Sequence, residues 1–187
     1  MRLDFHTYMP ALSLRAMTAD DATIVAALHA ASWRTAYRGI LSDEYLAGEV
    51  ELERAFTWKR RLDVLTDAQF GIIAMLGAIP VGFTFIVGHD DPTWGNLVDN
   101  LHVATEARSA GIGPHLLAAA ARGIEERGWD RRVYLRVYAA NERARKFYRR
   151  LGGVEIESIM KATVEGNMEK EWRVIWPDLR ALIPAEA

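Results

Sequence analysis

Residues 101–114 read LHVATEARSAGIGP, and this stretch decides the fold. The apolar residues at its start are typical of a strand, and the pattern Arg108-x-x-Gly111-x-Gly113 then opens a helix with a proline in its first turn. The first N–H groups of a helix have no intrahelical acceptor, and glycines let a ligand approach the backbone closely. The stretch therefore predicts a cradle for a compact anionic group such as a pyrophosphate.

Two better-known phosphate-binding patterns do not fit this stretch. A Walker loop needs Gly-Lys-Ser or Gly-Lys-Thr after its glycines, and Pro114 and His115 stand there instead. A Rossmann fingerprint needs a third glycine or alanine at the position of Leu116. Because Pro114 has no N–H, the donors of the cradle must come from the residues before it and from the following turn.

A second informative stretch, residues 133–154, reads VYLRVYAANERARKFYRRLGGV. It predicts a strand over Arg132–Tyr138, a helix over Glu142–Leu151 and a break at the two glycines that follow. Both stretches belong to a basic block: residues 101–150 hold eleven basic and five acidic residues, a net charge of +6, whereas the whole chain carries −2. This distribution favours a compact anionic partner over general nucleic-acid binding. The other interpretation is that the arginines only solvate two helices.

The segments Arg108–Gly113 (RSAGIG) and Asn141–Gly152 (NERARKFYRRLG) resemble the two acetyl-CoA motifs of the GCN5-related N-acetyltransferase (GNAT) superfamily. The segment Ser32–Ser42 also resembles a stretch common in bacterial members. There are two departures, since the family often has glycine at the position of Ser109 and phenylalanine at that of Val154. Both are common variations, and the order of elements along the entire chain resembles the family fold.

We expect one α/β (α+β) domain over residues 1–187. The resemblance implies a mixed, mostly antiparallel sheet of about seven strands flanked by helices, with a splayed V between the two central strands. Outside the two motifs, the expected elements are a short strand at Leu12–Ala16, a helix behind the capping box Thr18–Asp21, a second helix from about Asp43 to Leu65, the strand pair Phe70–Leu76 and Val81–Val87, a loop at His89–Pro92, a strand at Gly95–Val103, a helix over Pro114–Arg127, and a hairpin of Val154–Met160 and Met168–Trp176.

The resemblance also implies which residues hold acetyl-CoA. Backbone groups of the splayed strand, at Leu101, His102 and Val103, would pair with the pantetheine amides like an added strand. Asn141 would bond the pantetheine arm, next to Ala144. The pyrophosphate would lie on the turn formed by Arg108, Ser109, Ala110, Gly111, Ile112 and Gly113. The alternatives are that Arg108 is a solvated loop residue and that Asn141 is only the N-cap of its helix.

Tyr148 lies one helical turn after Ala144, and the resemblance implies that its hydroxyl lies near the thioester sulfur. A phenol is protonated at neutral pH, so it can act as the general acid that protonates the departing thiolate. The alternative is that Tyr148 only packs with Phe147 against the sheet.

Four residues are candidates for the base that deprotonates the acceptor amine. Asp99 is an acidic residue in an otherwise uncharged strand, and strict alternation places it on the face of Leu101. His102 is then expected on the opposite face, with an imidazole pKa suited to proton transfer. His29 and Glu44 are further candidates from the front helices. We take Asp99 as the first choice.

Trp33 and Tyr37 are the expected substrate-binding residues. They share one helical stripe with His29, and in this fold the first two helices and their connection wall the acceptor side. The other interpretation is that both rings fill core space against Ile40 and Leu41.

The composition excludes several classes of site. The chain has no cysteine, which removes disulfides, a cysteine nucleophile and thiolate metal ligands, and we expect no metal. Residues 1–4 have no apolar run, so we expect no signal peptide and a cytoplasmic protein. The uncharged run from Gly71 to Gly88 could mimic a membrane span, but its glycines and Pro80 favour two strands.

The sequence therefore predicts an acyl-CoA-dependent N-acyltransferase that moves acetyl from acetyl-CoA to a primary amine by direct attack. Two rivals stay open: transfer of a larger acyl group, and a non-catalytic acyl-CoA-binding sensor module. The acceptor is a small-molecule or peptide amine, and the net charge of −5 over residues 1–100 favours a cationic one. We expect no nucleic acid and no membrane as partner, and a homodimer is left open.

Overall fold

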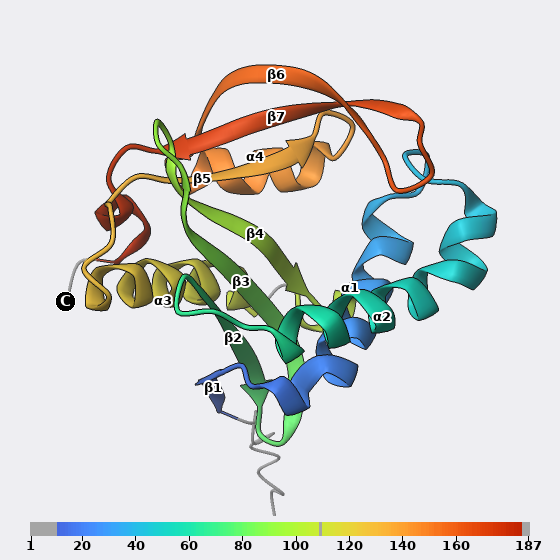
Figure 1. Cartoon of the computed structure of the whole chain (residues 1–187), viewed down its shortest axis with the longest axis horizontal. Coiled ribbons are helices and arrows are strands. Elements are labelled where there is room, and N and C mark those ends of the chain that lie inside the picture. Colours follow the sequence, from blue (N-terminus) through green and yellow to red (C-terminus); the bar gives the residue numbers. More distant parts are fainter. Residues whose placement is uncertain (1–10, 109, 185–187) are drawn as a thin grey trace, which may run out of the picture.

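The computed structural model describes residues 11–108 and 110–184 of the chain. The N-terminal residues on which the signal-peptide prediction rests lie outside this range. A central sheet with helices around it organises the described part (Figure 1). Its elements are β1 (Leu12–Ala16), α1 (Ala22–Ala36), α2 (Val50–Asp63), β2 (Gln69–Leu76), β3 (Ile79–Asp91), β4 (Gly95–Val103), α3 (Ile112–Glu126), β5 (Val133–Tyr138), α4 (Glu142–Arg150), β6 (Val154–Ala162) and β7 (Met168–Trp176).

Seven strands form one sheet in the order β1-β2-β3-β4-β5-β7-β6. All neighbouring pairs are antiparallel except β4 and β5, which run parallel. The expected α/β fold with a mixed, mostly antiparallel sheet of about seven strands is therefore confirmed.

The splayed V lies between β4 and β5. These strands pair only at Asn96 with Val133 and at Leu97 with Tyr134, close to the start of both. Beyond these two pairs the strands run apart (Figure 1). The facing edges of β4 and β5 therefore keep main-chain groups that can pair with an extended ligand.

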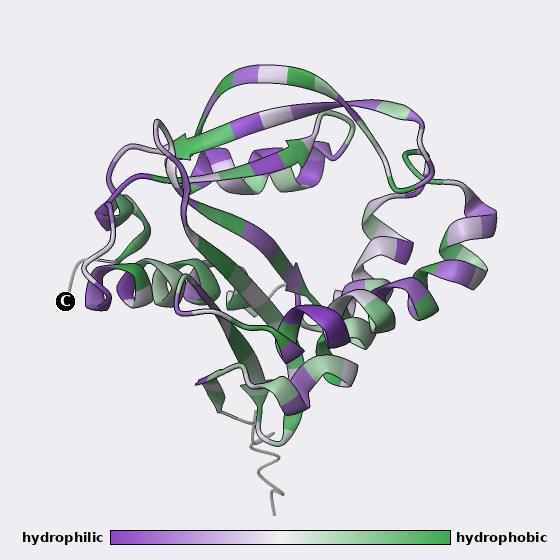
Figure 2. Cartoon of the chain, in the orientation of Figure 1, coloured by the Kyte–Doolittle hydropathy of each residue, from purple (hydrophilic) through white to green (hydrophobic). Residues whose placement is uncertain are grey.

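Helices cover both faces of the sheet. α1 and α2 pack on one face, where the Trp58 ring lies 5.3 and 5.4 Å from the rings of Phe83 and Phe85. α3 and α4 pack on the other face, in a cluster that includes Leu117 and Trp176. β2 and most of β3 are hydrophobic along their length, as strands covered on both faces must be, whereas β4 also carries polar residues (Figure 2).

Among the boundaries that differ from the sequence prediction, two affect the β3–β4 hairpin and the glycine turn. His89–Asp91, expected in a loop, continues β3, because Asp91 pairs with Gly95 and its carboxylate accepts the N–H groups of Thr93 and Trp94 at 2.8 and 3.0 Å. These bonds close a tight hairpin in place of a loop. α3 begins at Ile112, two residues before the expected start, since a proline is tolerated in the first turn of a helix.

The uncharged run from Gly71 to Gly88 forms β2 and most of β3, as predicted. The two strands are joined at Gly77, whose φ of +57° lies in the left-handed region that glycine adopts without strain. Within the two described ranges, no helix is long and apolar enough to cross a membrane.

Candidate active site

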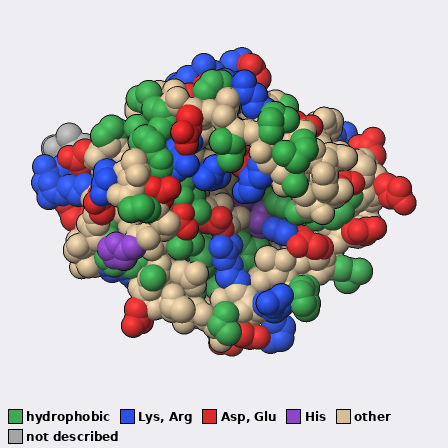
Figure 3. Space-filling view, turned by 45° about the horizontal axis from the view of Figure 1, so that its top comes forward, with side chains coloured by type: hydrophobic (Ala, Val, Ile, Leu, Met, Phe, Trp, Pro, Cys, Tyr) green, Lys and Arg blue, Asp and Glu red, His purple; other side chains and the backbone are tan. Residues whose placement is uncertain are grey.

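A cleft of about 470 Å³ opens where β4 and β5 diverge. In the space-filling view a hollow lies near the centre of the face, with charged side chains of both signs around it (Figure 3). The walls of the cleft come from the end of α1, β4, the start of α3, β5 and α4. The predicted site residues that line it are Tyr37, Asp99, Leu101, His102, Val103, Arg108, Gly113, Asn141, Ala144 and Tyr148.

The glycine turn forms one end of the cleft. Gly111 has a φ of +71° and directly precedes the first residue of α3. A Cβ at Gly113 would lie 2.9 Å from the ring of Phe147, so the first motif packs closely against the helix of the second. Ile112 is fully buried beneath this turn, and Ser109 lies outside the described residues. The glycines therefore bring two helices together at the place where the N-terminus of α3 is open to a ligand.

Arg108 and Arg143 give this end of the cleft its charge. Arg108 Nη2 donates to Thr35 Oγ1 at 2.7 Å, which ties the turn to the end of α1. Burial and the neighbouring Arg143 lower the pKa of Arg108. Arg136 and Arg150 line the same cleft. Guanidinium groups that repel one another beside a helix N-terminus are stabilised by an anion, so these residues fit a pyrophosphate.

Asn141 has a capping function in the structure. Its side-chain oxygen accepts the backbone N–H of Ala144 at 3.2 Å, which fixes the first turn of α4. Both residues also line the cleft. Asn141 is therefore the N-cap of α4, and its side-chain NH₂ can still bind a second partner.

Tyr148 lies deep in the cleft, with 8% of its surface exposed. Its ring packs at 5.3 Å against Phe147 and at 6.1 Å against Trp176. Burial raises the pKa of the Tyr148 phenol, so the hydroxyl keeps its proton at neutral pH. A buried hydroxyl of this kind can donate a proton to a strongly basic group beside it.

Asp99 and His102 both reach toward α1 and α2, so the prediction that they lie on opposite faces is wrong. Asp99 Oδ2 lies 2.6 Å from Arg61 Nη1 of α2, and His102 Nδ1 lies 3.0 Å from Ser32 Oγ of α1. Leu101, by contrast, packs on the α3 side. The reason is a β-bulge in β4 at Asp99, where the register with β3 shifts by one residue. An extra residue reverses the alternation on which the prediction relied.

The Asp99 carboxylate uses one oxygen for its protein contacts. Oδ2 forms the ion pair with Arg61 and accepts a hydrogen bond, at 2.6 Å, from the side-chain NH₂ of Asn100. For Oδ1 we find no hydrogen-bond partner in the described part of the chain. Since Asp99 lines the cleft, this second oxygen can bind a water molecule or an ammonium group there.

His102 stacks on His29 with ring centroids 4.3 Å apart. Burial, together with Arg54 and Arg108, lowers the pKa of His102 to about 3. Burial also lowers the pKa of His29, whose Nδ1 accepts the indole N–H of Trp58 at 2.9 Å. Both imidazoles are therefore neutral at physiological pH and are weak bases.

Trp33 and Tyr37, predicted together, occupy different places. Trp33 is buried beside Tyr45, and the Arg54 guanidinium stacks 4.3 Å from its ring centroid. Tyr37 lines the cleft and meets the ring of Tyr138 edge-on at 5.1 Å. Trp33 packs behind Tyr37 at 5.1 Å, so the core interpretation holds for Trp33 and Tyr37 is the residue on the cleft surface.

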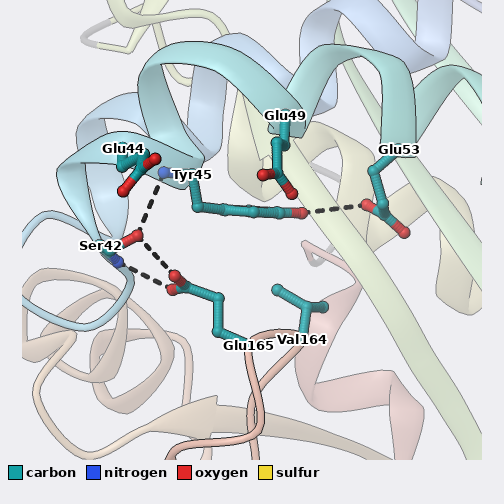
Figure 4. A pocket seen from close by; sticks show the side chains of 7 residues that line it. All are labelled: Ser42, Glu44, Tyr45, Glu49, Glu53, Val164 and Glu165. Carbon is teal, nitrogen blue, oxygen red and sulfur yellow. Dashed lines mark hydrogen bonds between the residues drawn. The ribbon is translucent and has the colours of Figure 1, made fainter.

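A second cavity, of about 520 Å³, lies between the start of α2 and the turn that joins β6 to β7 (Figure 4). Tyr45 donates its hydroxyl to Glu53 at 3.1 Å, and Glu165 accepts from the N–H and the hydroxyl of Ser42 at 2.8 and 2.5 Å. Glu44, a candidate base from the sequence, belongs to this cavity. The full lining is Ser42, Glu44, Tyr45, Glu49, Glu53, Val164 and Glu165.

Sequence reasoning missed several arginines of the cleft. Arg143 and Arg150 stand seven residues apart on one stripe of α4, together with Phe147, and the helical period could have revealed this. Arg136 comes from β5, where its neighbours Leu135 and Val137 also border the opening. For Arg136, the only sequence signal for a place in the cleft is that it belongs to the basic block.

Comparisons with known proteins agree with this architecture. The model of the acetyltransferase (GNAT) family matches residues 27–153. Three solved structures share the fold: a GCN5-related N-acetyltransferase from Rhodopseudomonas palustris (22% identity, TM-score 0.70, covering 91% of this chain and 98% of that one), a PaiA N-acetyltransferase from Thermoplasma acidophilum in complex with coenzyme A (19%, 0.62, 86% and 98%), and the ribosomal-protein-S18-alanine N-acetyltransferase from Escherichia coli (19%, 0.60, 94% and 97%).

A search of the curated proteins finds no significant match. At these identities the solved structures establish the fold alone. The family model, however, spans both motifs and more than half of the chain, from α1 to the break after α4. The protein therefore belongs to the GNAT acetyltransferase family and is an acyl-CoA-dependent N-acetyltransferase.

Proposed function

We propose that the protein transfers acetyl from acetyl-CoA to a primary amine by direct attack of the amine on the thioester. The observation that carries this proposal is the cleft itself. It joins the positively charged start of α3 to a buried phenol, Tyr148, and to a carboxylate, Asp99. One end suits the cofactor and the other the acceptor.

The cofactor is held by main chain and arginines in this proposal. The pyrophosphate binds the N–H groups at the start of α3 with help from Arg108 and Arg143, and the pantetheine arm pairs with the free edge of β4 at Leu101–Val103. Asn141 adds its side-chain NH₂. When bound, the cofactor supplies the acetyl group as an activated thioester.

Tyr148 acts as the general acid. Its phenol stays protonated because burial disfavours the charged phenolate, so a proton is available for the thiolate as it leaves. Phe147 and Trp176 fix the ring on both sides and limit where the hydroxyl can point.

Asp99 acts as the counter-ion of the acceptor. An ordinary aspartate is a weak base, and this carboxylate is already paired with Arg61 through Oδ2. Its free Oδ1 is better suited to attract and orient an ammonium group than to store a proton. The proton of the amine then passes to water, either directly or along the polar wall of the cleft.

Ser32 and His102 are arranged like the nucleophile and base of an enzyme that forms a covalent acyl intermediate. The chemistry of this pair argues against such an intermediate. Ser32 Oγ lies 3.0 Å from His102 Nδ1, the geometry of an activated hydroxyl. A pKa of about 3 makes His102 too weak a base to activate serine at neutral pH. The chain also lacks cysteine. Both observations support direct transfer.

The acceptor is cationic in this proposal. Residues 1–100 carry a net charge of −5, and the second cavity gathers four glutamates at the other side of the Trp33–Tyr45 contact. Such a field attracts positively charged amines and repels acidic ones. Short peptides with a free N-terminus and small polyamines both fit this description.

The decisive test measures release of free thiol from acetyl-CoA in the presence of a mixed library of primary amines, followed by mass spectrometry of the acetylated product. Turnover with one class of amine is the expected result. CoA binding without turnover across the library would identify an acyl-CoA sensor instead. Repeating the assay with propionyl-CoA and longer thioesters decides which acyl group the cleft accepts.

A further inference from the structure

β6 is one of the two edge strands of the sheet, and it exposes several apolar side chains. In the strand order no described strand pairs with its outer side, and in Figure 1 it forms the top of the molecule. Almost all of its residues are exposed. Ile159 and Met160 expose 40% and 58% of their surface, and Val154 exposes 52%.

The opposite edge of the sheet looks different. β1 has five residues, whereas β6 has nine. Natural proteins keep edge strands short or break them with charges, because an exposed edge offers unpaired N–H and C=O groups to another chain. A long edge that carries isoleucine and methionine at its centre is therefore suited to pair with a partner strand.

The order of charges along β6 selects a second copy of the chain as that partner. Glu157, Ile159 and Lys161 point to one face, since they pair with alternate residues of β7. If two β6 strands pair antiparallel about Ile159, each Glu157 lies opposite Lys161 of the other copy and the two Ile159 side chains meet. Opposite charges in such cross-strand pairs attract.

Neighbouring registers lack this complementarity. Pairing about Glu157 sets two glutamates against each other, and pairing about Ser158 sets Glu157 against Ile159. The bulge between Glu155 and Glu157 limits the regular part of the strand to Glu157–Ala162, so the symmetric ladder about Ile159 is Glu157–Lys161.

The two charged side chains have room for these contacts. Glu157 accepts from Arg173 Nε at 2.7 Å through Oε1 and is 45% exposed, so its other oxygen can reach outward. Lys161 is 54% exposed, and its nearest carboxylate, Glu171, lies at 3.6 Å, longer than a hydrogen bond.

We propose that the protein forms a homodimer in which the β6 strands of two copies pair antiparallel about Ile159, so that two sheets become one. The proposal does not depend on acetyl transfer. A five-residue ladder buries less than the roughly 800 Å² per partner of a standard interface, so the dimer is weak and depends on concentration.

Sedimentation velocity from low to high micromolar concentration tests the association. The wild type is expected to shift from monomer to dimer, and Ile159→Lys to stay monomeric, because two lysines then meet at the axis. Ile79→Lys, at an isoleucine of β3 that is 66% exposed, is the matched control and should dimerise like the wild type. A wild type that stays monomeric throughout overturns the proposal.

A charge exchange tests the register. Glu157→Lys and Lys161→Glu should each weaken the dimer about tenfold, because each sets like charges opposite one another. The double variant restores opposite pairs and should recover most of the affinity. Two single losses that simply add in the double variant contradict the register about Ile159.

Because the chain has no cysteine, a single introduced thiol reports the geometry directly. In the proposed register the Ile159 positions face each other at about 4.5–5.5 Å, within disulfide reach, whereas the Met160 positions are diagonal neighbours at about 7–8 Å, beyond it. Under mild oxidation Ile159→Cys should form a covalent dimer at least tenfold faster than Met160→Cys. Equal rates, or a faster Met160→Cys, would place the axis elsewhere.

Discussion

The proposed cofactor and acceptor ends of the cleft carry different charged groups and are built in different ways. The cofactor end, Arg108–Gly113 with Arg143, combines repelling guanidinium groups with the N-terminus of α3. The acceptor end, Tyr37, Asp99 and His102, presents a carboxylate between two neutral groups. In the proposed function, each ligand is selected by the charged groups at its own end. Variants at one end should therefore leave the affinity at the other end nearly unchanged.

The largest effect is expected from a negative charge in the glycine turn. Gly111→Asp places a carboxylate where we propose that the pyrophosphate binds, and aspartate tolerates the left-handed backbone at this position, where a Cβ meets nothing closer than 3.9 Å. CoA affinity should fall by at least about 100-fold. Thermal stabilisation by CoA measures this loss, and the melting temperature without CoA shows that the variant is folded.

Gly48→Asp is the matched control, since a side chain there meets nothing within 4 Å and the site lies outside the cleft. Gly113→Asp adds a steric test, because its Cβ also meets the Phe147 ring and should lower the stability of the free protein as well. If CoA stabilises Gly111→Asp as strongly as the wild type, the pyrophosphate binds elsewhere.

The second-largest effect concerns the proton that we propose Tyr148 gives to the departing thiolate. Tyr148→Phe removes only the hydroxyl and keeps the packing against Trp176, so CoA affinity should stay while kcat falls by roughly 100-fold or more. Steady-state kinetics with a confirmed acceptor check this. Tyr134→Phe, which removes a hydroxyl that bonds to Asp90, is the control. A wild-type rate for Tyr148→Phe would leave Tyr148 as a packing residue, with water protonating the thiolate.

The geometry of the proposed cofactor end could be predicted from the sequence because its parts are contiguous. Arg108 through Gly113 form one turn, and Asn141 through Tyr148 form one helix, so local spacing carries the information. Packing of Phe147 on Gly113 then brings the two motifs together. The resemblance to a known family rested on these same residues.

The acceptor end could not be predicted because it depends on contacts between distant segments. The bulge at Asp99 turns this residue toward Arg61, and neither glycine nor proline marks it between Asn96 and Leu101. Trp33 and Tyr37 lie on one stripe that continues past the end of α1, but Trp33 is covered by side chains from elsewhere, among them Tyr45 and Arg54. Side-chain periodicity describes a single element and says little about what another element covers.

A smaller effect should separate the two roles of Asp99. Asp99→Asn keeps the shape but removes the charge that we assign to the acceptor's ammonium group. KM for the amine should rise about tenfold with little change in kcat, and CoA affinity should not change. Kinetics at saturating acetyl-CoA over pH 6 to 9 measure this. A fall in kcat with an altered acidic limb would show that Asp99 is the base, and unchanged kinetics would remove it from the site.

The smallest effect is a pH dependence of stability at the acceptor end. Burial holds the pKa of His102 at about 3, well below the value near 6.5 of an unfolded chain, so below pH 6.5 the unfolded state binds a proton that the folded state does not. The contribution of His102 to the free energy of unfolding is therefore complete above pH 6.5 and is lost as the pH falls toward 3, by up to about 1.4 kcal/mol for each pH unit.

His102→Gln removes this titration, and urea unfolding at pH 7, 6 and 5 should show a shallower loss of stability than in the wild type. Burial also lowers the pKa of His29, so His29 accounts for the loss of stability that remains in this variant. Equal slopes in wild type and His102→Gln would mean that His102 is hydrated enough to titrate normally, and the argument against serine activation by His102 would then fail with it.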